Sequence, residues 1–179
     1  MGQKVLLNAK EVNIILHRLA CQLIEKHNDF SDTVLIGLQP RGIYLADRLA
    51  KILKDHYKVK DIKLGHLDIT FFRDDFRRGD KPLEANTTKI NFLVEDKNIV
   101  FIDDVLYTGR SIRAALTAIQ SFGRPNEIEL LTLIDRRFSR HLPIQPDYRG
   151  RQVDVINNEK VKVNWKEYDN EDSVYLIEK

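Results

Sequence analysis

Residues 100–111 read Val-Phe-Ile-Asp-Asp-Val-Leu-Tyr-Thr-Gly-Arg-Ser. The apolar run that begins at residue 98 and ends in two carboxylates is typical of a buried parallel strand. A helical pattern then opens near Gly109 and continues to about Phe122. Because a helix N-terminus has unpaired N–H groups and the positive end of the helix dipole, it binds anions. This strand, turn and helix predict a phosphate site at the end of a sheet.

The segments on either side alternate between strand and helix patterns. Apolar runs predict strands at 33–37, 62–72, 98–104 and 128–134, with shorter strands at 153–156, 161–165 and 174–177. The N-terminal residues are expected to lead almost directly into a helix that Asn8 and Glu11 cap and that ends near residue 27, and a second helix is expected at 43–57. The alternation predicts an α/β fold, one domain over residues 1–179 with a mainly parallel sheet flanked by helices.

Three of the predicted strands end in residues that can bind a ligand. The strand ends carry Pro40-Arg41-Gly42, Asp103-Asp104 and Asp135-Arg136. Ligands of parallel α/β sheets bind at the carboxyl ends of the strands, so we expect these residues to converge. A carboxylate pair accepts hydrogen bonds from vicinal hydroxyls or from magnesium-bound water, and a diol beside a monophosphate is a ribose 5-phosphate. A lone pair of acids is better explained as a solvated strand end, but the whole ordered string favours the sugar phosphate.

Composition excludes several other classes of protein. Hydrophobic residues make up 42% of the chain and charged residues 31%, and the net charge is +2, so nothing demands nucleic acid as a partner. No apolar run approaches the roughly 18 residues of a membrane span. The single cysteine, Cys21, cannot form an internal disulfide, which favours a cytoplasmic location. The five histidines lack metal-ligand spacing, so a dedicated transition-metal site is not expected.

The 100–111 string resembles the signature that type I phosphoribosyltransferases use to bind 5-phosphoribosyl-1-pyrophosphate (PRPP). It lacks the Gly-Lys-Ser/Thr ending of a nucleotide P-loop. Within that superfamily the chain resembles the bifunctional pyrimidine operon regulators and uracil phosphoribosyltransferases, and Tyr107 stands where purine-type relatives usually carry an acid. The resemblance extends along nearly the whole chain, through residues 41–46, 68–75, 123–125, 142–144 and 158–161.

The resemblance implies a fold with a small hood and a flexible loop, which residues 73–90 match, and a reaction in which uracil and PRPP give UMP and pyrophosphate. PRPP is expected to contact Pro40, Arg41, Gly42, Asp103, Asp104, Val105, Leu106, Tyr107, Thr108, Gly109, Arg110 and Ser111. Arg41, Arg73, Asp103 and Asp104 are the expected catalytic residues. The two aspartates are expected to hold Mg²⁺ mostly through substrate and water. Uracil is expected against Ile134, Asp135 and Arg136.

Regulation of pyrimidine genes through messenger RNA is a second class of function that the resemblance implies. Arg18, Arg137 and Arg140 are the RNA-binding candidates. The chain departs from the regulators at His17, where they have threonine, and at Gln145, where they commonly have arginine. Three alternatives remain open: an RNA-binding attenuation regulator that responds to uridine nucleotides and has little catalytic activity, a phosphoribosyltransferase for another base, and a protein that binds PRPP without catalysis. Relatives form dimers or larger assemblies, so a homo-oligomer is expected.

Overall fold

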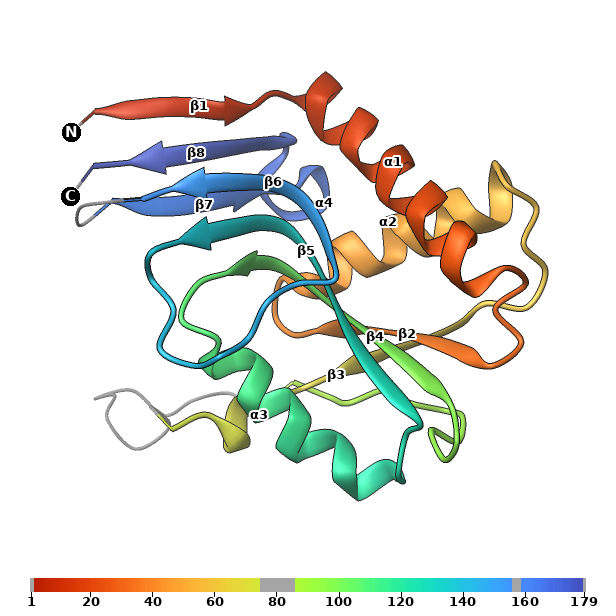
Figure 1. Ribbon diagram of the computed structural model, residues 1–179. Coiled ribbons are helices and arrows are strands. Elements are labelled where there is room, and N and C mark those ends of the chain that lie inside the picture. The colour runs from red at the N-terminus through yellow and green to blue at the C-terminus, as the bar shows by residue number, and fades with distance from the viewer. Residues whose placement is uncertain (1, 75–85, 156–158, 179) are drawn as a thin grey trace.

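Five parallel strands form the central sheet of the protein (Figure 1). The computed structural model describes residues 2–74, 86–155 and 159–178. The strands are β2 (Thr33–Leu38), β3 (Lys63–Leu67), β4 (Asn98–Leu106), β5 (Glu127–Arg137) and β6 (Tyr148–Asp154), in the order β3-β2-β4-β5-β6. The chain crosses from β2 to β3 on one side and from β4 to β5 on the other, so the carboxyl ends of β2 and β4 flank the switch point.

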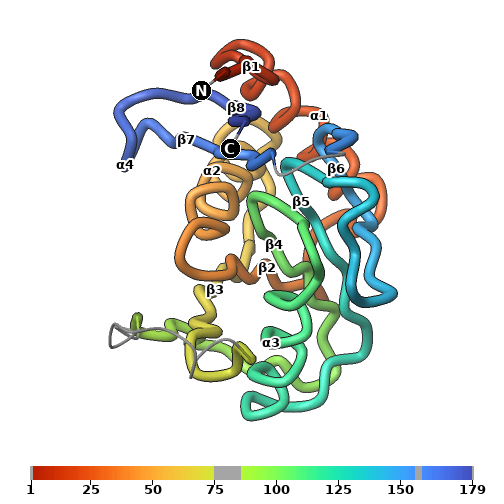
Figure 2. Tube along the Cα trace, turned by 90° about the vertical axis from the view of Figure 1, so that its left-hand side faces the viewer, coloured from red at the N-terminus to blue at the C-terminus, as the bar shows by residue number. Residues whose placement is uncertain are grey.

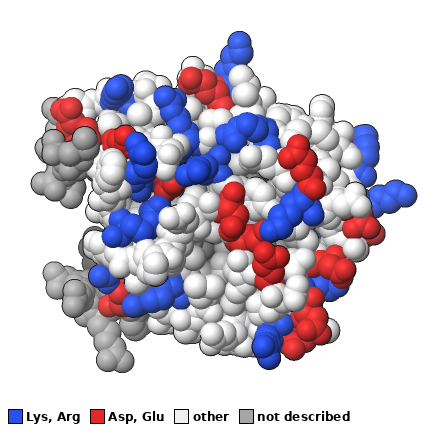
Figure 3. All heavy atoms as spheres, in the orientation of Figure 1, with Lys and Arg blue, Asp and Glu red and all other residues white. Residues whose placement is uncertain are grey.

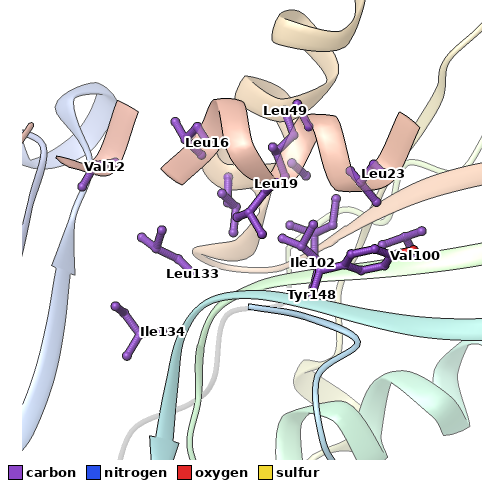
Figure 4. Close-up of a cluster of buried hydrophobic side chains, with 14 of the residues drawn as sticks. Val12, Leu16, Leu19, Leu23, Leu49, Val100, Ile102, Leu133, Ile134 and Tyr148 are labelled. Atoms are coloured by element: carbon purple, nitrogen blue, oxygen red, sulfur yellow. The ribbon is translucent and has the colours of Figure 1, made fainter. Parts of the chain in front are cut away.

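Helices cover both faces of this sheet (Figure 2). Helices α1 (Ala9–His27) and α2 (Gly42–Asp55) pack on one face, and α3 (Arg110–Ile119) packs on the other. Side chains alternate along a strand, so Val100 and Ile102 face α1 and α2 (Figure 4) while Phe101 faces α3. Each buried aliphatic side chain contributes about 1.5–3 kcal/mol, which fixes the register of β4. The predicted α/β class with flanking helices is confirmed.

A second, smaller sheet forms the predicted hood above the carboxyl ends of the main strands. It is antiparallel, in the order β1-β8-β7, and comprises β1 (Gln3–Leu7), β7 (Lys160–Asn164) and β8 (Ser173–Ile177), with α4 (Lys166–Asp169) beside it. Trp165 is fully buried in the hydrophobic cluster that the hood shares with the main sheet. The guanidinium of Arg48 on α2 lies 4.9 Å from the Trp165 ring centre, and this contact joins the hood to α2.

The Asn8 cap is confirmed, because the Asn8 side chain accepts from Glu11 N–H and the Glu11 carboxylate accepts from Asn8 N–H. The structure departs most from the predicted elements at three strands, and the other predicted bounds shift by one to three residues. Strand β1 precedes the first helix and pairs with β8, a partner at the other end of the chain. Strand β3 ends at Leu67, because the Asp68 carboxylate accepts from Thr70 N–H and turns the chain.

Strand β6 begins at Tyr148, five residues before the predicted start. The prediction missed this part because most of its side chains are solvated and its sequence shows no apolar run. Two predicted segments lie partly outside the described residues: the flexible loop at 73–90 and the strand at 153–156. Among the helices that the structure describes, none combines the length and apolarity needed to cross a membrane.

Candidate active site

The carboxyl end of β4 and the turn after it line a cavity of about 280 Å³. The lining residues are Arg73, Asp74, Asp103, Val105, Leu106, Tyr107, Thr108, Gly109, Arg110, Ser111 and Ile112. The turn reaches the α3 N-terminus through Gly109, whose φ of 91° lies in the left-handed region that favours glycine. The structure therefore gathers Arg73 and most of the residues predicted for PRPP around one cavity, at a helix N-terminus.

The N-terminus of α2 lies directly against β4 beside this cavity. A methyl group added to Gly42 would lie 2.9 Å from Asp103 Cα and would also overlap the Ile102 carbonyl oxygen. Only glycine allows this approach, because any Cβ would push the helix away from the strand. The close packing sets the predicted residue Gly42 next to Asp103 and holds Arg41 at the same edge.

Arg41 connects the end of β4 to the hood. Its Nη2 donates to the Val163 carbonyl and to Asp169 Oδ2, the latter at 2.6 Å, and its Nε lies 3.5 Å from Asp104 Oδ2. The guanidinium also lies 5.6 Å from the Tyr168 ring centre. The peptide bond between Gln39 and Pro40 is cis. A cationic side chain thus stands over the predicted diol-binding carboxylate, with its donors directed to hood acceptors.

Burial raises the pKa of both strand-end carboxyls. The Asp103 pKa is raised well above its ordinary value by desolvation and by the neighbouring charge of Asp104, against a smaller opposing effect of the Arg73 charge. Desolvation also raises the pKa of Asp104, which Arg41 partly offsets. Bringing a cation to this pair would favour its ionised form. A cation bound at this pair would therefore lower the pKa of both carboxyls.

Magnesium fits the chemistry of this pair, since carboxylate oxygens are the ligands that it prefers. Within residues 2–74, 86–155 and 159–178, no group of three or more His, Cys, Asp and Glu side chains is arranged to hold a metal. A magnesium ion at Asp103 and Asp104 would therefore complete its coordination with oxygens from substrate and water.

At the end of β5 the three residues predicted for the base have different environments. Ile134 is fully buried, and Asp135 is buried with its carboxylate bonded to Arg140 and Gln152. The Arg136 guanidinium lies 3.9 Å from the ring centre of Tyr107. All three residues lie within β5, which continues to Arg137 and pairs with β6, whereas the sequence predicted a strand that ends at residue 134. A base at this position would meet the Arg136–Tyr107 stack. Base binding by these residues stays a prediction.

Two acids near this edge of the sheet form ion pairs that were not anticipated from the sequence. Asp74 pairs with Arg110 and, at 2.8 Å, with Arg113, which links the residue after Arg73 to the α3 N-terminus. Asp135 pairs with Arg140 on the segment that follows β5. Only the abundance of arginine near these acids in the sequence could have suggested the pairs. Arg77, Arg78 and Lys81 belong to the predicted flexible loop and lie outside the described residues.

The three RNA-binding candidates all have partners within the chain. Arg18 donates to the carbonyls of Arg149 and Gly150, at 3.2 and 2.5 Å. Arg137 pairs with Asp154, and Arg140 with Asp135. Figure 3 shows basic side chains on the face where α1 and β6 lie, interspersed with acidic ones. The face carries both signs of charge.

Comparison with known proteins identifies the family to which a chain with this fold and cavity belongs. The chain matches the family model described as Phosphoribosyl transferase domain over residues 2–167. The hypoxanthine phosphoribosyltransferase of Staphylococcus aureus superposes with a TM-score of 0.72 at 20% identity, over 98% of this chain and 91% of that one. That of Trypanosoma cruzi gives 0.72 at 14% identity, over 97% and 95%. These two likenesses show the shared type I fold.

Closer relatives narrow the class. The chain is 42% identical over 177 residues to the Bifunctional protein PyrR of Elusimicrobium minutum, covering 99% of this chain and 98% of that protein. It is 38% identical over 176 residues to that of Enterococcus faecalis, covering 98% and 97%. The chain belongs to the phosphoribosyltransferase family and, within it, to the bifunctional PyrR proteins. The predicted family and the predicted enzyme class are confirmed.

Proposed function

We propose that this protein transfers the phosphoribosyl group of PRPP to uracil and releases pyrophosphate, giving UMP. The observation that carries the proposal is the convergence of a carboxylate pair, a helix-capped turn and two arginines on one edge of the sheet. The membership of the family supports the phosphoribosyl donor. The choice of uracil is supported by the likeness to the bifunctional proteins and by Tyr107.

Each part of the edge has one task in this reaction. The N–H groups of residues 107–111 bind the 5-phosphate at the α3 N-terminus. The Asp103 and Asp104 carboxylates accept hydrogen bonds from the ribose diol. They would also hold Mg²⁺, which would supply positive charge at this end of the site. Arg41 and Arg73 stabilise the negative charge that develops on pyrophosphate as its bond to ribose C1 breaks. A uracil ring nitrogen forms the new bond to C1, and its proton is released to water.

Removing either arginine tests this assignment. Arg41→Ala and Arg73→Ala should each lower kcat by about 10² or more, because each loses charge stabilisation at the leaving group. Arg124→Ala is the matched control, since Arg124 is exposed and precedes β5 at the opposite end of the strands. Steady-state rates of UMP formation for the three variants give the comparison. Normal turnover in both Arg41→Ala and Arg73→Ala would refute the assignment.

A second activity, regulation of pyrimidine genes through messenger RNA, is supported by Arg18 on α1 and by the likeness to relatives that are named bifunctional. Affinity for RNA rises with each phosphate that a cation neutralises, and log K falls with log salt by about 0.7 per contact for single strands. Arg18→Gln should therefore weaken binding of a pyrimidine leader RNA and reduce the salt slope by about 0.7.

The RNA measurement has a clear negative outcome. Filter binding with and without UMP, at several salt concentrations, gives both the affinity and the slope. Absence of any UMP-dependent binding at nanomolar protein would remove the regulatory role and leave the enzyme.

The proposal includes an oligomeric and cellular context. One hydrophobic cluster joins the hood strands to the main sheet, which supports a single domain over residues 1–179. A homodimer or larger homo-oligomer and a cytoplasmic location complete the proposal, on the strength of the resemblance to relatives and of the lone Cys21. Sedimentation equilibrium would measure the assembly directly.

A further inference from the structure

The segment that follows β5 is bonded to the back of the phosphate-binding turn. Arg140 Nη1 donates to the carbonyl of Leu106, at 3.2 Å, and to the carbonyl of Tyr107. One residue later, the backbone N–H of His141 donates to the Thr108 carbonyl at 3.0 Å. Three consecutive carbonyl groups of the turn are therefore held by two neighbouring residues of another segment.

Holding these carbonyls fixes where the amides point. In a trans peptide the C=O and the N–H of the same plane point in opposite directions. The planes whose carbonyls belong to residues 106, 107 and 108 carry the N–H groups of Tyr107, Thr108 and Gly109. Those N–H groups are directed away from Arg140 and His141. Successive N–H groups on one side of a turn form an anion-binding concavity, and these three residues line the cavity described above.

The guanidinium itself is held in place from the other side. Arg140 Nη2 pairs with Asp135 Oδ1, and Gln152 donates to Asp135 Oδ2 at 3.3 Å. The Asp135 side chain is only 4% exposed, so this acid is a fixed support. Arginine suits the task, because its planar fork can serve two carbonyls and a carboxylate together, whereas lysine offers a single point charge. The paired acid also offsets much of the guanidinium charge, so the contribution of Arg140 is one of geometry.

We propose that Arg140 is a positioning residue, which aims the N–H groups of Tyr107, Thr108 and Gly109 at the 5-phosphate of the substrate by holding the carbonyls behind them. The inference rests on the proposed function for the phosphate itself. It gives this arginine, first considered for RNA, a role in the transfer reaction. It also assigns the Asp135 carboxylate to the support of the phosphate turn.

Calorimetric titration with two separate ligands tests the proposal. Ribose 5-phosphate reports on the phosphate turn, while pyrophosphate with Mg²⁺ reports on the other half of the PRPP site. Arg140→Gln should lose about tenfold in affinity for ribose 5-phosphate and keep its affinity for pyrophosphate. The ribose 5-phosphate affinity of Arg140→Lys should lie between those of Arg140→Gln and the unchanged protein. Arg151→Gln is the matched control, because Arg151 also donates to a backbone carbonyl, that of Leu6 at 2.6 Å, away from the turn.

The outcomes separate the inference from the proposed function. Unchanged ribose 5-phosphate affinity in Arg140→Gln would overturn the inference and leave the function standing. Full affinity in Arg140→Lys would also overturn it, because charge would then suffice. An equal loss of affinity for ribose 5-phosphate and for pyrophosphate in both variants would also overturn the inference, because the effect would not be specific to the phosphate-binding turn. Failure of the unchanged protein to bind ribose 5-phosphate would remove the proposed function and the inference together.

Discussion

Replacing Gly42 with alanine should destabilise the protein, although the same change stabilises most helices. Gly42 is the first residue of α2, where alanine is ordinarily favoured over glycine by up to about 1 kcal/mol. Here the new methyl group would lie 2.9 Å from Asp103 Cα and would overlap the Ile102 carbonyl. Ordinary carbon contacts are about 3.5–4.0 Å, so α2 and β4 must separate by roughly 0.6 Å or more. Both obstructing atoms belong to the backbone and cannot rotate away.

Overpacking of this kind costs about 1–3 kcal/mol. For a chain of this size each kcal/mol lowers Tm by about 2–4 °C, so Gly42→Ala should melt roughly 2–12 °C below the unchanged protein. Turnover should fall as well, because the separation moves Arg41 away from Asp104. Gly65→Ala is the matched control, since two of the three atoms nearest its methyl group belong to the side chains of Ile90 and Phe92, which can adjust. A Tm for Gly42→Ala equal to or above that of the unchanged protein would refute the close approach of α2 to β4.

Further predictions concern buried groups away from the cavity. Desolvation lowers the pKa of His27 below 6.5, so the unfolded chain takes up this proton first on acidification. The free energy of unfolding in urea should therefore fall as the pH drops from about 6.5 toward the lowered pKa. In His27→Gln this free energy should depend less on pH. A rise in the free energy of unfolding on acidification would contradict a neutral His27 imidazole in the folded protein. Trp165→Ala should cost about 3–5 kcal/mol in the same assay, because it empties the centre of the hood; a loss under 1 kcal/mol would show that the hood does not depend on this side chain.

The parts of the fold that the sequence predicted are those that local pattern encodes. The apolar run before Asp103, the helical spacing before His27 and the Asn8 cap each depend on residues within one element, and the structure has all three. The strand ends were predictable for the same reason, since parallel strands bring their carboxyl ends to one edge. Strand β1 was not, because five residues acquire strand character only by pairing with β8.

The contacts that shape the site could not be read from the sequence. Arg41 and Asp169 are separated by 128 positions, and Arg140 and Tyr107 by 33. Which carboxylate or carbonyl an arginine meets depends on the tertiary path of the chain and the reach of a flexible side chain. The sequence could place Arg41 at a strand end, but its attachment to the hood required the structure. The contact between the Asp135 carboxylate and Arg140 could likewise be found only from the structure.

The proposed transfer reaction can be measured as product formation from PRPP. The protein would be incubated with PRPP, Mg²⁺ and one labelled base at a time, with uracil, orotate, hypoxanthine and guanine compared at equal concentration. We expect that uracil alone is converted, with one pyrophosphate released for each UMP. Conversion of hypoxanthine, guanine or orotate in place of uracil, or no product from any base while PRPP binds, would contradict it.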